Sequence, residues 1–533
     1  MATTTRLRSR RSAAQLHALA GVEQEIRAAD PGSRRKYLRE FSQAFRSYES
    51  LVSPDEARHA IGSADVVLVA DYHALPACQR YAASLLEERA QPGDRPVVLG
   101  VETIFSRDQH ILDEWWRREI DEHEFRQRIR FDVDWGYEWE PFHQLLVSAR
   151  EHAEAIYGLD CMPREDLRKI GARDRHAVHK IAEIRQRHAN AVILVLFGES
   201  HLAPQHLPRQ LRELMPGERA LTVLQNVDPL YWQAAGEPQE RVEAVRVTGD
   251  VICVFNSTPL EKYENYRLHL SRWGRAEEEG PDLAPTIYNL IDSLLRFLKI
   301  NLYSSHNGTQ PKFIVDLMPE VFCGVSEARL RRLLTLETGS PEIQEAFLRK
   351  IEERGSAYLP RTNTFYVREF QIMYAAEEAA RFLHSACRGL PALASPEKFN
   401  EPGDRFYART VENALAYLGS RILYPARPAT PEGVELPRSA LNDAMKAAVR
   451  GDAAEFEASA QRCGYVIGSG LYEKYLTGAV SRSQLRHLFL THLDEPGRAR
   501  KLCLELVRNR RAPRKDPQPD HRLRRRGARR STA

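Results

Sequence analysis

Two short motifs in this sequence place an acidic residue two positions before a histidine. Imidazole and carboxylate groups together suit Zn²⁺, Mn²⁺ or Fe²⁺. A histidine held by a carboxylate can also act as a general base in ester or amide hydrolysis. The two motifs are Asp71-Tyr72-His73 and Glu199-Ser200-His201.

Each motif follows a short apolar run, Val66–Ala70 in the first case and Ala191–Phe197 in the second. Runs of this length and composition are typical of strands buried on both faces, as in a parallel sheet. Gly198 interrupts the second run, so the residues after it should emerge at the carboxyl end of a strand. Because residues two apart in extended backbone point to the same side, each acid–histidine pair should address one pocket.

The surrounding sequence alternates between apolar strands and helical patterns, which predicts an α/β fold with a mostly parallel sheet flanked by helices. Two further strands lead into Glu102 and Asp160. Since parallel strands end at one edge, these carboxylates should converge with the two motifs. The predicted strands cover residues 64–70, 96–101, 154–159, 191–197 and 219–225.

Beyond this region the pattern becomes helical, without further alternation or chemical motif. We therefore expect an additional all-helical C-terminal domain joined to the α/β domain by a hairpin and a charged, turn-rich linker. The predicted organisation is a basic disordered arm and amphipathic helix over 1–50, the α/β domain over 51–235, the hairpin and linker over 236–285, the helical accessory domain over 286–507, and a basic disordered tail over 508–533.

The amino-acid composition limits the classes of protein to which this chain can belong. The 533 residues are 43% hydrophobic and 28% charged, as in ordinary globular proteins. No apolar run reaches the roughly 18 residues of a membrane span. Seven scattered cysteines without a CxxC pair favour a reducing compartment, so we expect a cytoplasmic protein.

The positive charge is concentrated in the tail, where eleven Lys and Arg residues face two Asp residues, a net charge of +9. The rest of the chain therefore carries −5, which is not basic enough to argue for a nucleic-acid enzyme. A solvated tail is the favoured interpretation, and contact with nucleic acid or an anionic surface is the alternative.

Each of these features also has a purely structural explanation. An acid–x–histidine at a strand end is often a helix-capping acid beside a surface histidine, and only the repetition after two matched strands favours a site. Arg173-Asp174 lies in a predicted helix, where a solvated charged face is the default. Core packing is favoured over a platform for a flat ligand for four tryptophans, Trp115, Trp116, Trp135 and Trp139.

Residues from about 53 to 235 resemble the ChaN-like haem-binding domain, which is grouped with the Tiki, TraB and erythromycin-esterase-like proteins. The order and spacing of six pieces carry the resemblance. They are VVLVADYH (66–73), VVLGVE (97–102), DWGYEWEPFHQLLVSARE (134–151), AIYGLD (155–160), ARDRHAVHKI (172–181) and VILVLFGESH (192–201).

The resemblance implies haem binding, metal-dependent proteolysis or hydrolysis through a His/Glu site, according to the branch of the group. It also implies functional roles for the residues that match its motifs, including the Arg173-Asp174 step. This sequence has Ala70-Asp71 where the group usually has Gly-Glu, so the first carboxylate is one methylene shorter. The helical half has no counterpart in the minimal family domain.

Our leading hypothesis is a ChaN-like haem- or metal-binding protein whose ligand lies at the carboxyl edge of the sheet. A metal-dependent hydrolase with the same residues and a non-catalytic adaptor with a degenerate domain are the alternatives. The expected metal ligands are Asp71, His73, Glu199 and His201; the expected catalytic residues are Glu102, Glu199 and His201; and the expected cofactor-binding residues are Tyr72, His73, His201, Arg173 and Asp174.

Overall fold

A computed structural model describes most of the chain, and every structural statement below concerns that part. The described residues are 2–30, 36–89, 95–161, 170–239, 241–272, 282–301, 314–324, 327–388, 401–431, 433 and 435–507. The predicted basic tail, 508–533, lies outside them.

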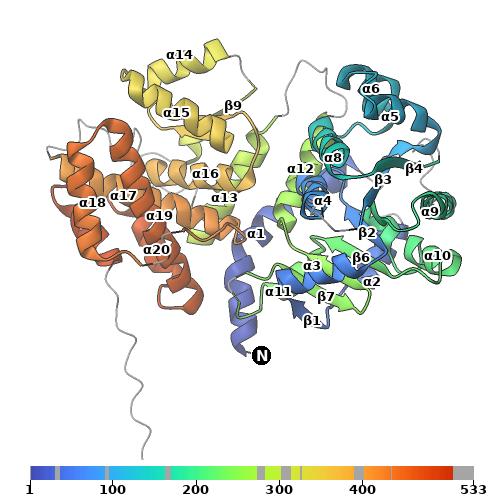
Figure 1. Cartoon of the computed structure of the whole chain (residues 1–533). Coiled ribbons are helices and arrows are strands. Elements are labelled where there is room, and N and C mark those ends of the chain that lie inside the picture. The colour runs from blue at the N-terminus through green and yellow to red at the C-terminus, as the bar shows by residue number, and fades with distance from the viewer. Residues whose placement is uncertain are drawn as a thin grey trace, which may run out of the picture.

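An eight-stranded sheet with helices on both faces forms one half of the molecule (Figure 1). Its strand order is β1-β7-β8-β6-β2-β5-β3-β4, and the pairs from β8 to β4 are parallel. The predicted α/β class is confirmed. The strands are β1 (Ser50–Val52), β2 (Val66–Asp71), β3 (Val97–Phe105), β4 (Ala155–Asp160), β5 (Val192–Gly198), β6 (Ala220–Gln225), β7 (Ala244–Thr248) and β8 (Val251–Val254).

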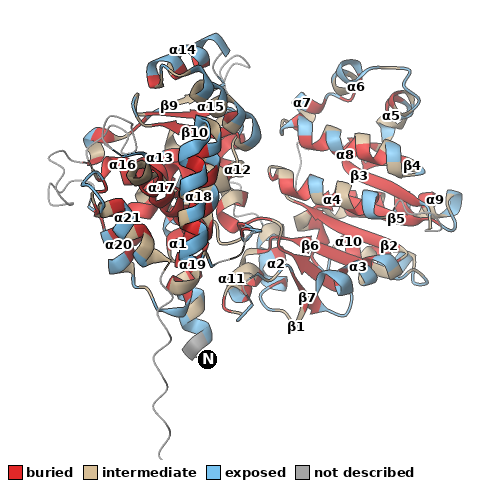
Figure 2. Ribbon diagram, turned by 60° about the vertical axis from the view of Figure 1, so that its left-hand side comes forward, coloured by how far each residue is buried: buried red, intermediate tan, exposed pale blue. Residues whose placement is uncertain are grey.

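Alternate residues of the central strands pack into two separate hydrophobic cores, one on each face of the sheet. Val67 and Val69 of β2 pack on one side, while Val66 and Leu68 pack on the other. Both faces are covered by helices, which explains why these strands are apolar throughout (Figure 2). The first face is covered by α3 (Pro54–Ser63), α4 (Pro76–Glu88), α5 (Gln109–Trp116) and α8 (Trp139–His152), and the second by α2 (Lys36–Ala44), α9 (Ile170–Arg187), α10 (Leu207–Leu214) and α11 (Asp228–Ala234).

The predicted hairpin is present as β7 and β8, and it extends this same sheet rather than standing apart from it. The linker prediction was wrong over residues 261–272, because these belong to helix α12 (Pro259–Arg272), which buries several charged side chains. Pairing allows so polar a segment to be buried, because Lys262 pairs with Glu199 of the α/β half, and Glu264 pairs with Arg267 of the same helix.

The other half is a helical assembly with a large core around the helix α17 (Pro402–Leu423), which is buried along most of its length (Figure 2), and a smaller core beside its small sheet. The expectation of an all-helical domain missed this sheet, β10-β11-β9. The remaining elements are α13 (Ala284–Leu298), β9 (Glu320–Cys323), α14 (Glu327–Glu337), α15 (Pro341–Arg354), β10 (Ser356–Leu359), β11 (Thr364–Val367), α16 (Ile372–Ala386), α18 (Arg438–Arg450), α19 (Ala453–Thr477), α20 (Arg482–Leu490) and α21 (Arg498–Leu506).

The N-terminal arm is not disordered, because Ala2–Ala29 forms helix α1 between the two halves (Figure 1). A stripe of small and aliphatic residues at spacings of four packs into the helical core. The polar residues around this stripe make it a weak signal in the sequence, so the helix was not predicted. Arg11 donates hydrogen bonds to the carbonyl oxygens of Glu237 and Gln239 at 2.7 and 2.8 Å. The stripe consists of Ala14, Ala18, Val22 and Ile26.

None of the described helices is both long enough and apolar enough to cross a lipid bilayer.

Candidate functional site

The carboxyl ends of β2, β5 and β3 bring the predicted site together. Asp71 ends β2 opposite Gly198, which ends β5. On the other side of β5, Val101 pairs with Leu196, so Glu102 follows at the same level. The third strand runs on to Phe105 instead of ending at Glu102 as predicted, so this carboxylate is buried within the strand.

Glu102 lies between two histidines. The Nε2 atom of His73 is 3.7 Å from Glu102 Oε2, and the Nε2 atom of His201 is 3.7 Å from Glu102 Oε1. The side chains of Glu102 and His201 are only 2% and 5% exposed, whereas that of His73 is 12% exposed. His73 is therefore the member of this group that solvent or a ligand reaches first.

A buried aspartate fixes each imidazole at its other nitrogen. His73 Nδ1 lies 2.7 Å from Asp71 Oδ2, and His201 Nδ1 lies 2.5 Å from Asp174 Oδ1. Gln79 donates a hydrogen bond to the second oxygen of Asp71. Carboxylates in these positions favour the tautomer in which Nδ1 carries the proton and Nε2 the lone pair.

Arg173 of α9 contacts both Glu102 and Asp160. Its guanidinium donates two hydrogen bonds to Asp160, at 2.9 and 2.7 Å, and a third to Glu102. Burial alone would lower the pKa of Arg173, but the two carboxylates outweigh it and raise that pKa. The backbone N–H of Gly198 donates to the other oxygen of Glu102. Both oxygens of Glu102 thus accept hydrogen bonds that fix its orientation.

Gly198 is required by the closeness of these groups. A Cβ atom at this position would lie 2.9 Å from Glu102 Oε2 and 3.2 Å from His73 Nε2. Its backbone angles, φ −50° and ψ 131°, are open to any residue, so the requirement is steric rather than conformational.

Four buried carboxylates belong to this network, and among the described residues Arg173 pairs with two of them. Moreover, Asp174 Oδ2 is buried without a hydrogen-bond partner in the described part of the chain, with His206 Nδ1 3.6 Å away. An enclosed region of this kind favours a bound cation. The four carboxylates are Asp71, Glu102, Asp160 and Asp174.

Glu199 does not join this group, because after Gly198 the chain enters a short 3-10 helix, Glu199–Leu202, in which residues two apart no longer share a side. Its carboxylate instead accepts hydrogen bonds from Lys262 of α12 at 2.9 and 3.1 Å. Burial alone would lower the pKa of Lys262, but Glu199 outweighs it and raises that pKa. The pair is a buried ion pair.

Tyr72 lies against this ion pair, with Lys262 Nζ 4.4 Å from the centre of its ring. Burial raises the pKa of Tyr72 well above its usual range.

Aromatic rings cover the exposed side of His73. Trp135 and Tyr137 lie with ring centres 5.1 and 5.3 Å from that of His73. Tyr137 stacks at 4.2 Å on His269 of α12, which joins this cover to the helix that carries Lys262. Trp115 and Trp139 belong to the packing around α5 and α8 instead.

The structure thus brings together most of the predicted residues: Asp71, His73, Glu102, Asp160, Arg173, Asp174 and His201. Sequence reasoning missed Gln79, His206 and above all Lys262. The only signal for Lys262 was a basic residue in a segment taken for a linker, because its partner Glu199 lies 63 positions earlier.

Comparison with known families agrees with this architecture. Residues 58–194 match the family described as haem-binding uptake, Tiki superfamily, ChaN. This part of the chain is ChaN-like. The matched segment of the ChaN-like domain includes every site residue above that precedes β5, whereas His201 and Lys262 lie beyond it.

A solved structure described as cofacial heme binding to ChaN of Campylobacter jejuni aligns with 34% of this chain and 93% of its own, at 12% identity and a TM-score of 0.25. No curated protein matches the sequence.

Proposed function

We propose that the ChaN-like domain binds a divalent transition-metal ion through His73 Nε2, His201 Nε2 and the Glu102 carboxylate. The observation that carries the proposal is the pair of aspartate-fixed imidazoles, each with its Nε2 atom 3.7 Å from a different oxygen of Glu102. The three ligand atoms do not all lie within 4.8 Å of one another, so binding one ion would require the imidazoles to move closer together. Two histidines and one carboxylate are a known ligand set for Fe²⁺ and related ions. Asp71 and Asp174 would act behind the ligands and orient them, as carboxylates behind metal-bound histidines commonly do.

The charge of the network supports the same proposal. A divalent ion would place positive charge beside four buried carboxylates, of which Arg173 pairs with Glu102 and Asp160. Glu199, expected among the ligands, is excluded from this proposal because Lys262 already neutralises it.

Haem fits the inner group less well than an ion does. A haem iron would have to reach an imidazole directly, and His201 is almost fully buried while Trp135 and Tyr137 cover His73. Binding of haem, the ligand named in the family description, would require this aromatic cover to open.

Metal analysis of the purified protein tests the proposal. The His73→Ala/His201→Ala double variant should lose one tightly bound equivalent relative to the wild-type protein. The matched control is His188→Ala. His188 precedes the amino end of β5, at the opposite edge of the sheet, and forms hydrogen bonds with Tyr157 and Glu154. Unchanged metal content in the double variant would overturn the proposal. A saturable Soret change with haemin that disappears in His73→Ala would replace the ion by haem.

Hydrolysis is the second candidate, favoured by the orientation and partial exposure of His73. With Nδ1 held by Asp71, its Nε2 is free to accept a proton from water or from a substrate hydroxyl. A divalent ion supplies Lewis acidity and lowers the pKa of water at such a site. A panel of esters and peptides, with Glu102→Gln as the inactive comparison, tests this candidate. If no substrate is hydrolysed and neither metal nor haem is bound, the remaining hypothesis is the non-catalytic adaptor.

A further inference from the structure

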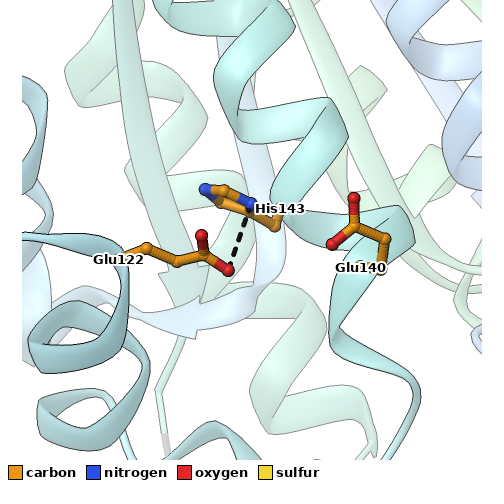
Figure 3. Close-up of side chains that lie close together, drawn as sticks. All are labelled: Glu122, Glu140 and His143. Carbon is orange, nitrogen blue, oxygen red and sulfur yellow. Dashed lines mark ion pairs between the residues drawn. The ribbon is translucent and has the colours of Figure 1, made fainter.

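A second group of potential ligands lies outside the buried network, where helix α6 (Glu122–Arg128) meets the first turn of α8. Glu122, Glu140 and His143 each offer a ligand atom, and all three atoms lie within 4.8 Å of one another (Figure 3). The carboxylate of Glu122 is 3.3 Å from His143 Nδ1. Glu140 and His143 are three positions apart on one helix, a spacing that directs both side chains to the same face.

Neighbouring side chains orient these three groups and leave a free oxygen on each carboxylate. Trp139 Nε1 donates to Glu122 Oε1 at 2.8 Å, and Gln144 Nε2 donates to Glu140 Oε1 at 2.8 Å. The His143 ring stacks on Trp139, with centres 5.5 Å apart and planes 16° apart. Ligands fixed in advance by such contacts lose less freedom when they bind an ion.

An ordinary ion pair does not account for the arrangement. His143 with Glu122 would be sufficient for one, and Glu140 adds a second negative charge beside it. The nearby arginines are already paired, Arg126 with Asp132 at 2.5 Å and Arg128 with Glu114 at 2.5 Å. The side chain of Glu122 is 49% exposed, so an ion can enter from solvent.

We propose that Glu122, Glu140 and His143 form a second divalent-metal site, suited to Zn²⁺ or a similar ion with mixed nitrogen and oxygen ligands. Three protein ligands would leave one position of a tetrahedral ion for water. This site shares no residue with the buried one and does not depend on it.

The position of the site gives it a structural consequence. The chain between Glu122 and Glu140 passes through the short helix α7 (Phe131–Asp134) and carries Trp135 and Tyr137, the two rings that cover His73. An ion joining α6 to α8 closes this segment at both ends, and closing a segment of about 18 residues removes freedom that it would otherwise retain. Occupancy of the second site should therefore hold the aromatic cover in place.

Zn²⁺ titration tests the site in the His73→Ala/His201→Ala background, which leaves only the second group. That protein should bind one equivalent, and adding His143→Ala should weaken binding at least tenfold. Adding Glu122→Gln, which keeps an acceptor for Trp139, should also weaken it. The matched control is His123→Ala, which removes an exposed histidine next to Glu122 and should leave the affinity unchanged.

Two results would overturn the site: equal Zn²⁺ affinity with and without His143, or equal weakening by His123→Ala. The consequence for the cover is measured separately by amide hydrogen exchange. Zn²⁺ should slow exchange over residues 129–138 in the background protein and have no effect once His143 is removed. Unchanged exchange with Zn²⁺ bound would refute the role in holding the cover.

Discussion

Replacement of Arg173 by Met removes a buried cation that pairs with two carboxylates. Its guanidinium donates hydrogen bonds to both Asp160 and Glu102, which also accept the backbone N–H groups of Cys161 and Gly198 respectively. Removing one partner of a buried ion pair costs about 3–5 kcal/mol. Because two carboxylates lose their partner together, we expect the upper part of that range.

Urea unfolding followed by tryptophan fluorescence measures this cost, since four of the six tryptophans lie between residues 115 and 139 of the α/β half. For a slope of about 3 kcal/mol per molar urea, the midpoint should fall by roughly 1.3–1.7 M. The control is Arg209→Ala, which removes an arginine 57% exposed and 3.4 Å from Glu213. It should cost less than about 0.5 kcal/mol.

A charge-neutral variant separates lost electrostatics from lost packing. Adding Asp160→Asn and Glu102→Gln to Arg173→Met neutralises the two carboxylates that lose their partner, so at least half of the stability should return. A triple variant as unstable as the single one would refute the assignment to buried charge. So would an Arg173→Met protein within about 1 kcal/mol of the wild type.

Three further changes test other parts of the structure. Gly198→Ala should cost about 1–3 kcal/mol and weaken metal binding at least tenfold, because the new Cβ meets Glu102 and His73; calorimetric titration at unchanged affinity would contradict this. Gly468→Ala should lower the unfolding free energy by about 1–3 kcal/mol, because its Cβ would lie 2.5 Å from the Ala414 carbonyl oxygen, although helix propensity alone predicts a gain of about 1 kcal/mol. Burial alone would raise the pKa of Glu377, but Arg427, Arg354 and Arg381 outweigh it and lower that pKa below 4.5. The carboxylate therefore stabilises the fold above pH 4.5 and loses this contribution in acid, so the deficit of Glu377→Gln in urea unfolding should be largest near neutral pH and should shrink below pH 4.5; a deficit that stays constant would exclude the ion-pair explanation.

The sheet could be predicted because its signals are local. Each parallel strand is apolar along its whole length, and a chain segment of that kind must be covered on both faces. The convergence of Asp71, His73, Glu102 and His201 followed from topology, since parallel strands end at one edge. The helix of the N-terminal arm was missed because its apolar stripe is made largely of alanines, which become core residues only when the helical half packs on them.

The sequence by itself determined which residues could do chemistry and at which edge of the sheet they would lie. The sequence did not determine which of these residues pair with one another and which pair with other partners. The same acid–x–histidine spacing gives a bonded pair at Asp71 and His73 but splits Glu199 from His201, because a 3-10 turn replaces extended backbone after Gly198. Only the tertiary structure supplies Asp174 as the partner of His201 and Lys262 as the partner of Glu199. These partners come from helices distant in sequence, and a buried charge is satisfied by whatever group the packing brings within reach.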